Sequence, residues 1–175
     1  RFLFRTGAAS DPRGKEGVAQ LTAAMLARGG SRAMPYESIV EAFFPLAAGL
    51  GAQVDKEMTV FSGTTHVESL DRYYGIVRGM LLEPGWREDD FRRVKDEALN
   101  ELRIGLRSNN EEELGKEFLY STIYAGRPYA HPNLGLARSL EALTLVDVKA
   151  FHAAQYRRGN LVAGIAGGYP NGFAE

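Results

Sequence analysis

Three histidines are the side chains of this sequence best suited to bind a metal or transfer protons near neutral pH: His66, His131 and His152. Imidazole is the commonest metal ligand in proteins, and its ordinary pKa lies close to physiological pH. No two of the three have the H-x-x-x-H spacing that places two imidazoles on one helix face. A nonlocal site that joins them with Glu101 or Asp55 stays open, but the spacing favours scattered surface or hydrogen-bonded histidines.

Other catalytic signatures are missing from the sequence. With zero cysteines there are no thiolate nucleophiles, thiolate ligands or disulfides. The serine motif G-x-S-x-G and the phosphate-binding motif G-x-x-x-x-G-K-[ST] do not occur. The Gly-rich stretch at 163–172 lacks the helix and the acidic residue of a dinucleotide fingerprint, so we interpret it as the end of a strand. Any metal would need His, Asp and Glu.

Length and composition favour one soluble α+β domain that spans residues 1–175. The chain is 45% hydrophobic and 25% charged, and its net charge of -1 gives no electrostatic case for nucleic acid or an anionic membrane. No apolar run approaches the roughly 18 residues that span a bilayer. The first ten residues lack the ordered regions of a signal peptide, so the compartment is unknown, with periplasm and cytoplasm both open.

Hydrophobic periodicity predicts which segments are strands and which are helices. Strands are expected at 1–6, 52–57, 58–67 and 160–168, and helices at 17–28, 35–49, 69–82, 87–107, 111–124, 139–143 and 144–156. Pro45 should break the second helix. Adjacent strands without regular β-α alternation predict an antiparallel sheet packed against helices. A first strand cut at its beginning, and a further helix starting in 169–175, suggest a fragment of a longer chain.

The helix expected at 17–28 has two different faces. At about 100° per residue, larger apolar side chains gather on one face, whereas small or neutral ones gather on the other. The first set is Val18, Leu21, Met25 and Leu26, and the second is Gln20, Ala23, Ala24 and Ala27. Small side chains on the second face allow another segment to approach closely, so we expect the space beside this face to be filled or to have a smoother wall. Alternatively, alanines stand there because they are good helix formers.

The order G-x-A-x-L-x-x-x-M-L in this helix resembles the pitrilysin/insulinase-type zinc metallopeptidases, the inverzincins whose helix carries H-x-x-E-H. The resemblance continues through RTGAASDPRGKEGVAQL and through the longer segments at 50–102 (LGAQVDKE to DEALNEL) and 126–169 (GRPYAHPNLG to GIAGGY), so it covers nearly the whole chain. It implies a metallopeptidase half-module of the LuxS/mitochondrial-processing-peptidase-like metallohydrolase fold.

The resemblance also assigns site positions. The family's first histidine, its glutamate base and its second histidine fall on Gln20, Ala23 and Ala24. The third ligand, a glutamate, falls on Glu101, because 101 - 24 = 77 is the family spacing, and a further family glutamate falls on Val94. Only Glu101 is retained. The plainer interpretation of Glu101 is a solvated carboxylate near Arg93, Glu97 and Arg103.

The resemblance therefore implies zinc as the family cofactor but no cofactor and no catalytic residue in this chain. We expect a noncatalytic module that pairs with an active zinc peptidase module or subunit and helps form its peptide-binding chamber. An extended peptide could pair with a sheet edge. The substrate-binding residues stay unassigned. Two alternatives are open: a structural assembly subunit like the core proteins of respiratory complexes, and an active zinc peptidase with an unusual site.

Overall fold

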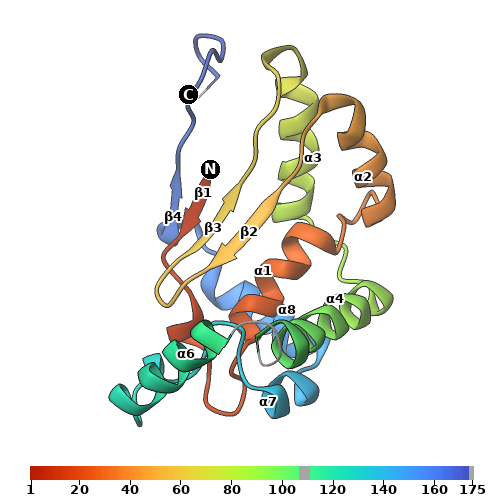
Figure 1. Cartoon of the computed structure of the whole chain (residues 1–175). Helices are drawn as coiled ribbons and strands as arrows, with labels where there is room; N and C mark the ends of the chain where they lie inside the picture. The colour runs from red at the N-terminus through yellow and green to blue at the C-terminus, as the bar shows by residue number, and fades with distance from the viewer. Residues whose placement is uncertain (107–110, 174–175) are drawn as a thin grey trace.

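A computed structural model of the chain describes residues 1–106 and 111–173, and its centre is a four-stranded antiparallel sheet (Figure 1). The strands are β1 (Phe2–Phe4), β2 (Gly51–Val54), β3 (Thr59–Ser62) and β4 (Leu161–Ala163), in the order β2-β3-β1-β4. The predicted pairing of the two neighbouring runs is confirmed by the β2–β3 hairpin. The predicted α+β class with an antiparallel sheet is therefore correct.

Helices pack on one face of this sheet and continue beyond its lower end (Figure 1). They are α1 (Val18–Arg28), α2 (Tyr36–Phe43), α3 (Leu70–Leu82), α4 (Glu88–Asn100), α6 (Glu111–Ile123), α7 (Ala137–Ala142) and α8 (Leu145–Gln155). As predicted, α2 ends just before Pro45. Thr144 and Asp147 form a reciprocal capping box at the start of α8, which explains why the helix begins where the sequence indicated.

Several predicted boundaries differ from the structure; the strand expected at 58–67, for example, is limited to Thr59–Ser62. The helix expected at 87–107 is α helical only to Asn100 and continues as a π-helix at Glu101–Leu106, while residue 107 lies outside the described residues. The last strand is limited to Leu161–Ala163, because the glycines that follow offer no side chains to pack. The expected start of a helix at 169–175 is a turn as far as 173, and residues 174–175 lie outside the described part.

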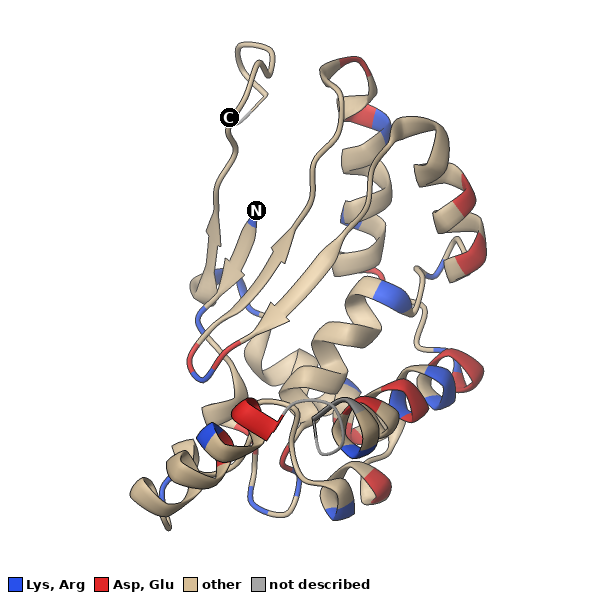
Figure 2. Ribbon diagram, in the orientation of Figure 1, with Lys and Arg blue, Asp and Glu red and all other residues tan. Residues whose placement is uncertain are grey.

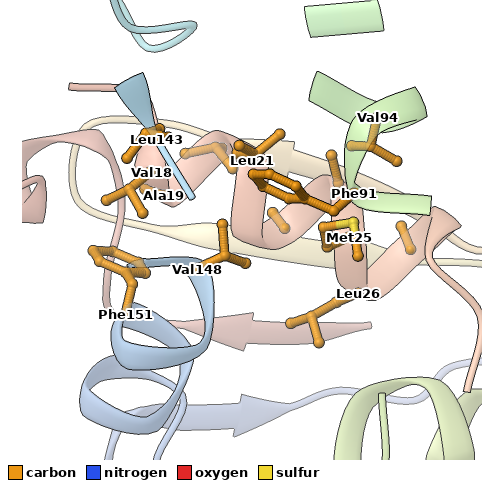
Figure 3. Packing of buried hydrophobic residues seen from close by; sticks show 14 of the residues in the cluster. Val18, Ala19, Leu21, Met25, Leu26, Phe91, Val94, Leu143, Val148 and Phe151 are labelled. Atoms are coloured by element: carbon orange, nitrogen blue, oxygen red, sulfur yellow. The ribbon is translucent and has the colours of Figure 1, made fainter. Parts of the chain in front are cut away.

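The helix α1 lies at the centre of the core, between the sheet, α4 and α8. Figure 3 shows Phe91 of α4 directed at α1 and Val148 of α8 on another side of the same helix. Nine of the eleven residues of α1 are buried, all except Gln20 and Arg28. Both faces distinguished in the sequence are therefore buried, because neighbouring elements cover the alanine face as well.

The start of α1 is held by a buried carboxylate from the preceding loop. The N-cap position is Gly17, which has no side chain, and the N–H groups of Gly17 and Ala19 donate instead to the Asp11 carboxylate at 2.6 and 2.9 Å. The side chain of Asp11 is fully buried, and His131 Nε2 lies 4.0 Å from its Oδ2. Lys56 in turn donates to the His131 carbonyl oxygen. These contacts join the loop before α1, the β2–β3 turn and the loop at 126–136.

The loop at 126–136 also contacts α1 through backbone alone. Gly135 has φ +89°, and a Cβ at this position would lie 2.5 Å from Gly17 Cα and closer still to the Glu16 carbonyl oxygen. Both the left-handed conformation and the close approach therefore require glycine. This packing fixes the start of α1 against a distant part of the sequence.

We expect Gly135→Ala to lower the free energy of unfolding by about 2–5 kcal/mol, because left-handed strain and a backbone clash add together. Gly14→Ala is the matched control, since Gly14 has φ +79° and a Cβ added there would meet no atom within 4 Å. It should cost only about 1–2 kcal/mol. Urea unfolding of the three proteins measures both changes, and equal losses in the two variants would contradict the close approach.

The buried carboxyl of Asp11 predicts an unusual pH dependence. Burial raises its pKa from 3.8 to about 6, although two backbone hydrogen bonds and nearby His131 oppose the rise. The folded protein then binds one more proton than the unfolded chain between about pH 4 and 6, so this contribution to stability is lost as pH rises through 6. Between pH 4 and 7, the free energy of unfolding of the unsubstituted protein should fall by up to about 3 kcal/mol relative to that of Asp11→Asn.

Asp147 is the control for this pH experiment because its shift has the opposite sign. Lys15 and Thr144 hold the Asp147 pKa down at about 2, so its stabilisation is present above pH 4 and is lost as pH falls. Urea unfolding across pH 2–7 compares Asp11→Asn and Asp147→Asn with the unsubstituted protein. If Asp11→Asn left the slope between pH 4 and 7 unchanged, the buried carboxyl would not be its source.

Candidate functional site

The helix α1 brings three of the residues singled out by sequence to the middle of the molecule. Gln20 is half-buried, whereas Ala23 and Ala24 are only 1% and 6% exposed. Both alanines belong to the main hydrophobic cluster. The face of α1 that carries these positions is therefore largely packed, and only Gln20 offers a polar atom.

The fourth position, Val94, lies on α4 and is completely buried in the same cluster. Figure 3 shows it beside Phe91, on the side of α4 that faces α1. An ionised carboxylate at this place would lose its hydration without an evident partner. The structure thus brings Ala23, Ala24 and Val94 together, but as methyl groups in a core.

Glu101 is the fifth position, and it is exposed to solvent at the first residue of the π-helical segment. The arginines expected near it have other partners: Arg93 binds Asp90 and Glu97, and Arg103 binds Glu141. Within residues 1–106 and 111–173, no side-chain hydrogen bond or ion pair involves Glu101. Among the described residues, therefore, no cation holds its exposed carboxylate.

The donor groups at these positions do not suit zinc. Alanine and valine have no lone pair to donate, and Gln20 supplies only a neutral amide oxygen, whereas zinc sites use His, Cys, Asp and Glu. Over the described ranges, no three residues of these types lie close enough together to hold a metal ion. The residues present therefore do not fit a catalytic zinc, and we derive no reaction step from one.

The three histidines lie in separate environments. His66 is exposed and its Nδ1 accepts a long 3.4 Å hydrogen bond from the Glu68 N–H. The ring of His152 stacks on that of Tyr156 and meets that of Trp86 edge-on, with 5.3 Å between the ring centroids in both pairs. Burial lowers the pKa of His152. His131 belongs with Asp11, as described above. The nonlocal histidine site considered from sequence is not formed by the described residues.

The contact between Asp11 and His131 is the polar cluster that sequence reasoning missed. These residues are 120 positions apart, since 131 - 11 = 120, and no sequence pattern indicates that they pair. One local signal existed: Gly17 begins α1 without a capping side chain, so an external acceptor was needed for its first N–H groups. The cluster positions α1 and contributes no catalytic group to the Gln20 face.

None of the helices in the described part of the chain is long and apolar enough to cross a membrane.

The chain is similar in sequence to curated proteins that are named as zinc proteases or peptidase subunits. No model of a protein family matches the chain. A protein named "Uncharacterized zinc protease" from Rickettsia felis is 23% identical over 166 residues, which are 95% of this chain and 40% of that protein. The mitochondrial-processing peptidase subunit beta of Caenorhabditis elegans is 23% identical over 70% of this chain and 26% of its own length. The chain thus spans well under half of these relatives.

Solved structures with a similar fold also come from peptidases. A crystal structure of a peptidase M16 inactive domain from Pseudomonas fluorescens has a TM-score of 0.81 and 30% identity, covering 91% of this chain and 38% of that one. The first half of the periplasmic protease PqqL from Escherichia coli has a TM-score of 0.78 at 14% identity and covers 91% of this chain and 35% of that one, which shows the shared fold. The resemblance to the pitrilysin/insulinase-type metallopeptidases is therefore confirmed by relatives named zinc protease and by the solved M16 inactive domain.

Proposed function

We propose that residues 1–175 act as one noncatalytic α+β module of a pitrilysin-type peptidase, pairing with an active zinc peptidase module or subunit. One observation carries this proposal: the family's base and second histidine positions are Ala23 and Ala24, and both are packed in the core. Val94, at the position of the further family glutamate, is buried in the same cluster. Three groups that the chemistry needs are replaced by methyl groups that stabilise the fold.

This pattern differs from a site that has lost a single ligand. Zinc peptidase chemistry needs a water polarised by the metal and a carboxylate that accepts its proton. With no imidazole on α1 and no carboxylate at 23 or 94, neither half of that arrangement exists. The retained Glu101 is exposed and cannot hold zinc alone.

The sheet supports a further part of the proposal, a share in binding extended peptides. Its two edge strands are β2 and β4, and each has one side without a partner strand among the described residues. Gly51 and Gln53 on β2 and all three residues of β4 are exposed. An extended peptide can add to such an edge through main-chain hydrogen bonds, which gives affinity with little dependence on sequence.

Zinc content tests the loss of the metal site. After dialysis against buffer containing zinc, the purified protein should hold far less than one equivalent, measured by elemental analysis, and Glu101→Gln should not change that amount. It should not cleave unfolded peptides. Stoichiometric zinc, together with turnover that Glu101→Gln abolishes, would instead establish an enzyme with an unusual site.

A substitution at Ala23 tests whether the alanine face of α1 is packed against its neighbours or borders an open cleft. Ala23→Glu should lower the free energy of unfolding by about 4 kcal/mol or more, or prevent folding, because it buries an unpaired carboxylate. Gln20→His on the half-buried edge of the same helix is the control and should cost no more than about 1 kcal/mol. Urea unfolding provides the measurement. If the Ala23→Glu variant were as stable as the unsubstituted protein, an open cleft would have to lie beside this face of α1.

Pairing is tested with a pitrilysin-type subunit from the same genome that has an intact H-x-x-E-H motif, or with the remainder of the same polypeptide added separately. We expect a complex in sedimentation velocity and faster hydrolysis of unfolded peptides by the complex than by the active subunit alone. A complex without peptide binding would support a structural assembly subunit. Failure to form any complex would overturn the proposed function.

A further inference from the structure

The helix α6 is rich in apolar side chains, yet none of its residues is buried. Phe118 is 75% exposed and Ile123 is 62% exposed. The other exposed apolar side chains on α6 are Leu114, Leu119 and Tyr120. Figure 1 shows α6 at one lower edge of the molecule, projecting away from the sheet and the core helices. Solvent-facing helices normally have apolar residues on one stripe only, so this pattern indicates a surface that is covered in an assembly.

The exposed residues lie on opposite faces of α6. Leu114 and Phe118 help line a mostly apolar groove of about 220 Å³, which the loop residues Pro132 and Leu136 close on the other side. Leu119 and Ile123 are four residues apart, and the 100° turn per residue places them away from that groove. A single extended peptide in the groove would leave them in water. Covering both faces requires a folded partner with a concave apolar surface.

The charge on α6 indicates the sign of the charge on the partner's contact surface. The helix has four glutamates, Glu111, Glu112, Glu113 and Glu117, but only one cation, Lys116. Lys116 already pairs with Glu112 and Glu113 at 2.7 Å. Figure 2 shows the acidic residues concentrated at the start of the helix. A partner surface with arginine or lysine beside its apolar patch would complement this acidic end.

We propose that α6, with the adjoining groove, is the surface on which the active peptidase module docks. The partner inserts a large apolar side chain into the groove, covers Leu119 and Ile123, and places basic residues against the first turn. This inference rests on the proposed function, because it names the surface used for pairing. A second copy of this chain fits less well, since a symmetric contact would bring the same excess of glutamates from both copies.

Single substitutions on α6 test the proposal in the complex with the H-x-x-E-H-bearing subunit described above. Phe118→Asp and Ile123→Asp should each weaken the affinity about tenfold or more, measured by isothermal titration calorimetry, because each places a charge in an apolar contact. Binding should also weaken as salt rises to about 0.5 M, since acidic and basic groups face each other. Circular dichroism should show both variants folded, because these side chains are exposed.

Val146→Asp on α8 and Phe44→Asp beside α2 are the matched controls, since these side chains are 73% and 86% exposed, belong to other elements and do not line the groove. They should leave the affinity unchanged. If the unsubstituted protein forms a complex that the α6 variants also form with equal affinity, the docking surface is wrong while the proposed function stands. If the protein alone self-associates, and Ile123→Asp abolishes this, the partner is a second copy and the proposal is overturned.

Discussion

The burial of α1 is the constraint on which the rest of the structure depends. This helix contacts the sheet on one side and α4 and α8 on others, so nearly every residue it presents must fit a packed interior. Burying a Leu or Met side chain contributes about 1.5–3 kcal/mol, and Leu21, Met25 and Leu26 are all at most 1% exposed. The helix is kept because the core is built around it.

The same packing explains why catalytic positions can become core positions. Polar groups in the interior must be paired or they cost free energy, and a metal site provides that pairing for its ligands. Small apolar residues at buried positions carry no such cost. This applies to Ala23, Ala24 and Val94, which lie in one cluster on two packed helices. All three side chains therefore suit a packed interior.

The positioning of α1 depends on polar contacts at its first turn. Asp11 accepts two backbone N–H groups, and Gly135 lets a distant loop approach Gly17. These contacts set the start of the helix without contributing a catalytic group. In contrast, α6 is attached at the edge of the structure and leaves its apolar residues in water. The molecule thus combines a firmly packed centre with an uncovered edge.

Much of the fold followed from the sequence alone, because it depends on local patterns. Periodicity located α1, α3 and α8, Pro45 marked the end of α2, and the two adjacent β-rich runs predicted the β2–β3 hairpin. The resemblance assigned the family's site positions to Gln20, Ala23, Ala24, Val94 and Glu101, and this assignment stays a prediction. Side-chain type alone was enough to show that alanine and valine cannot bind a metal.

Only the tertiary structure decided what surrounds those residues. Helical periodicity measures one face at a time, so it could not show that α4 and α8 cover the alanine face of α1. The change of helix type at Glu101 and the pairing of Asp11 with His131 likewise depend on contacts between distant segments. The sequence by itself determined which chemistry the side chains can perform, and the tertiary structure decided which of them are buried, because burial depends on neighbours that are far away along the chain.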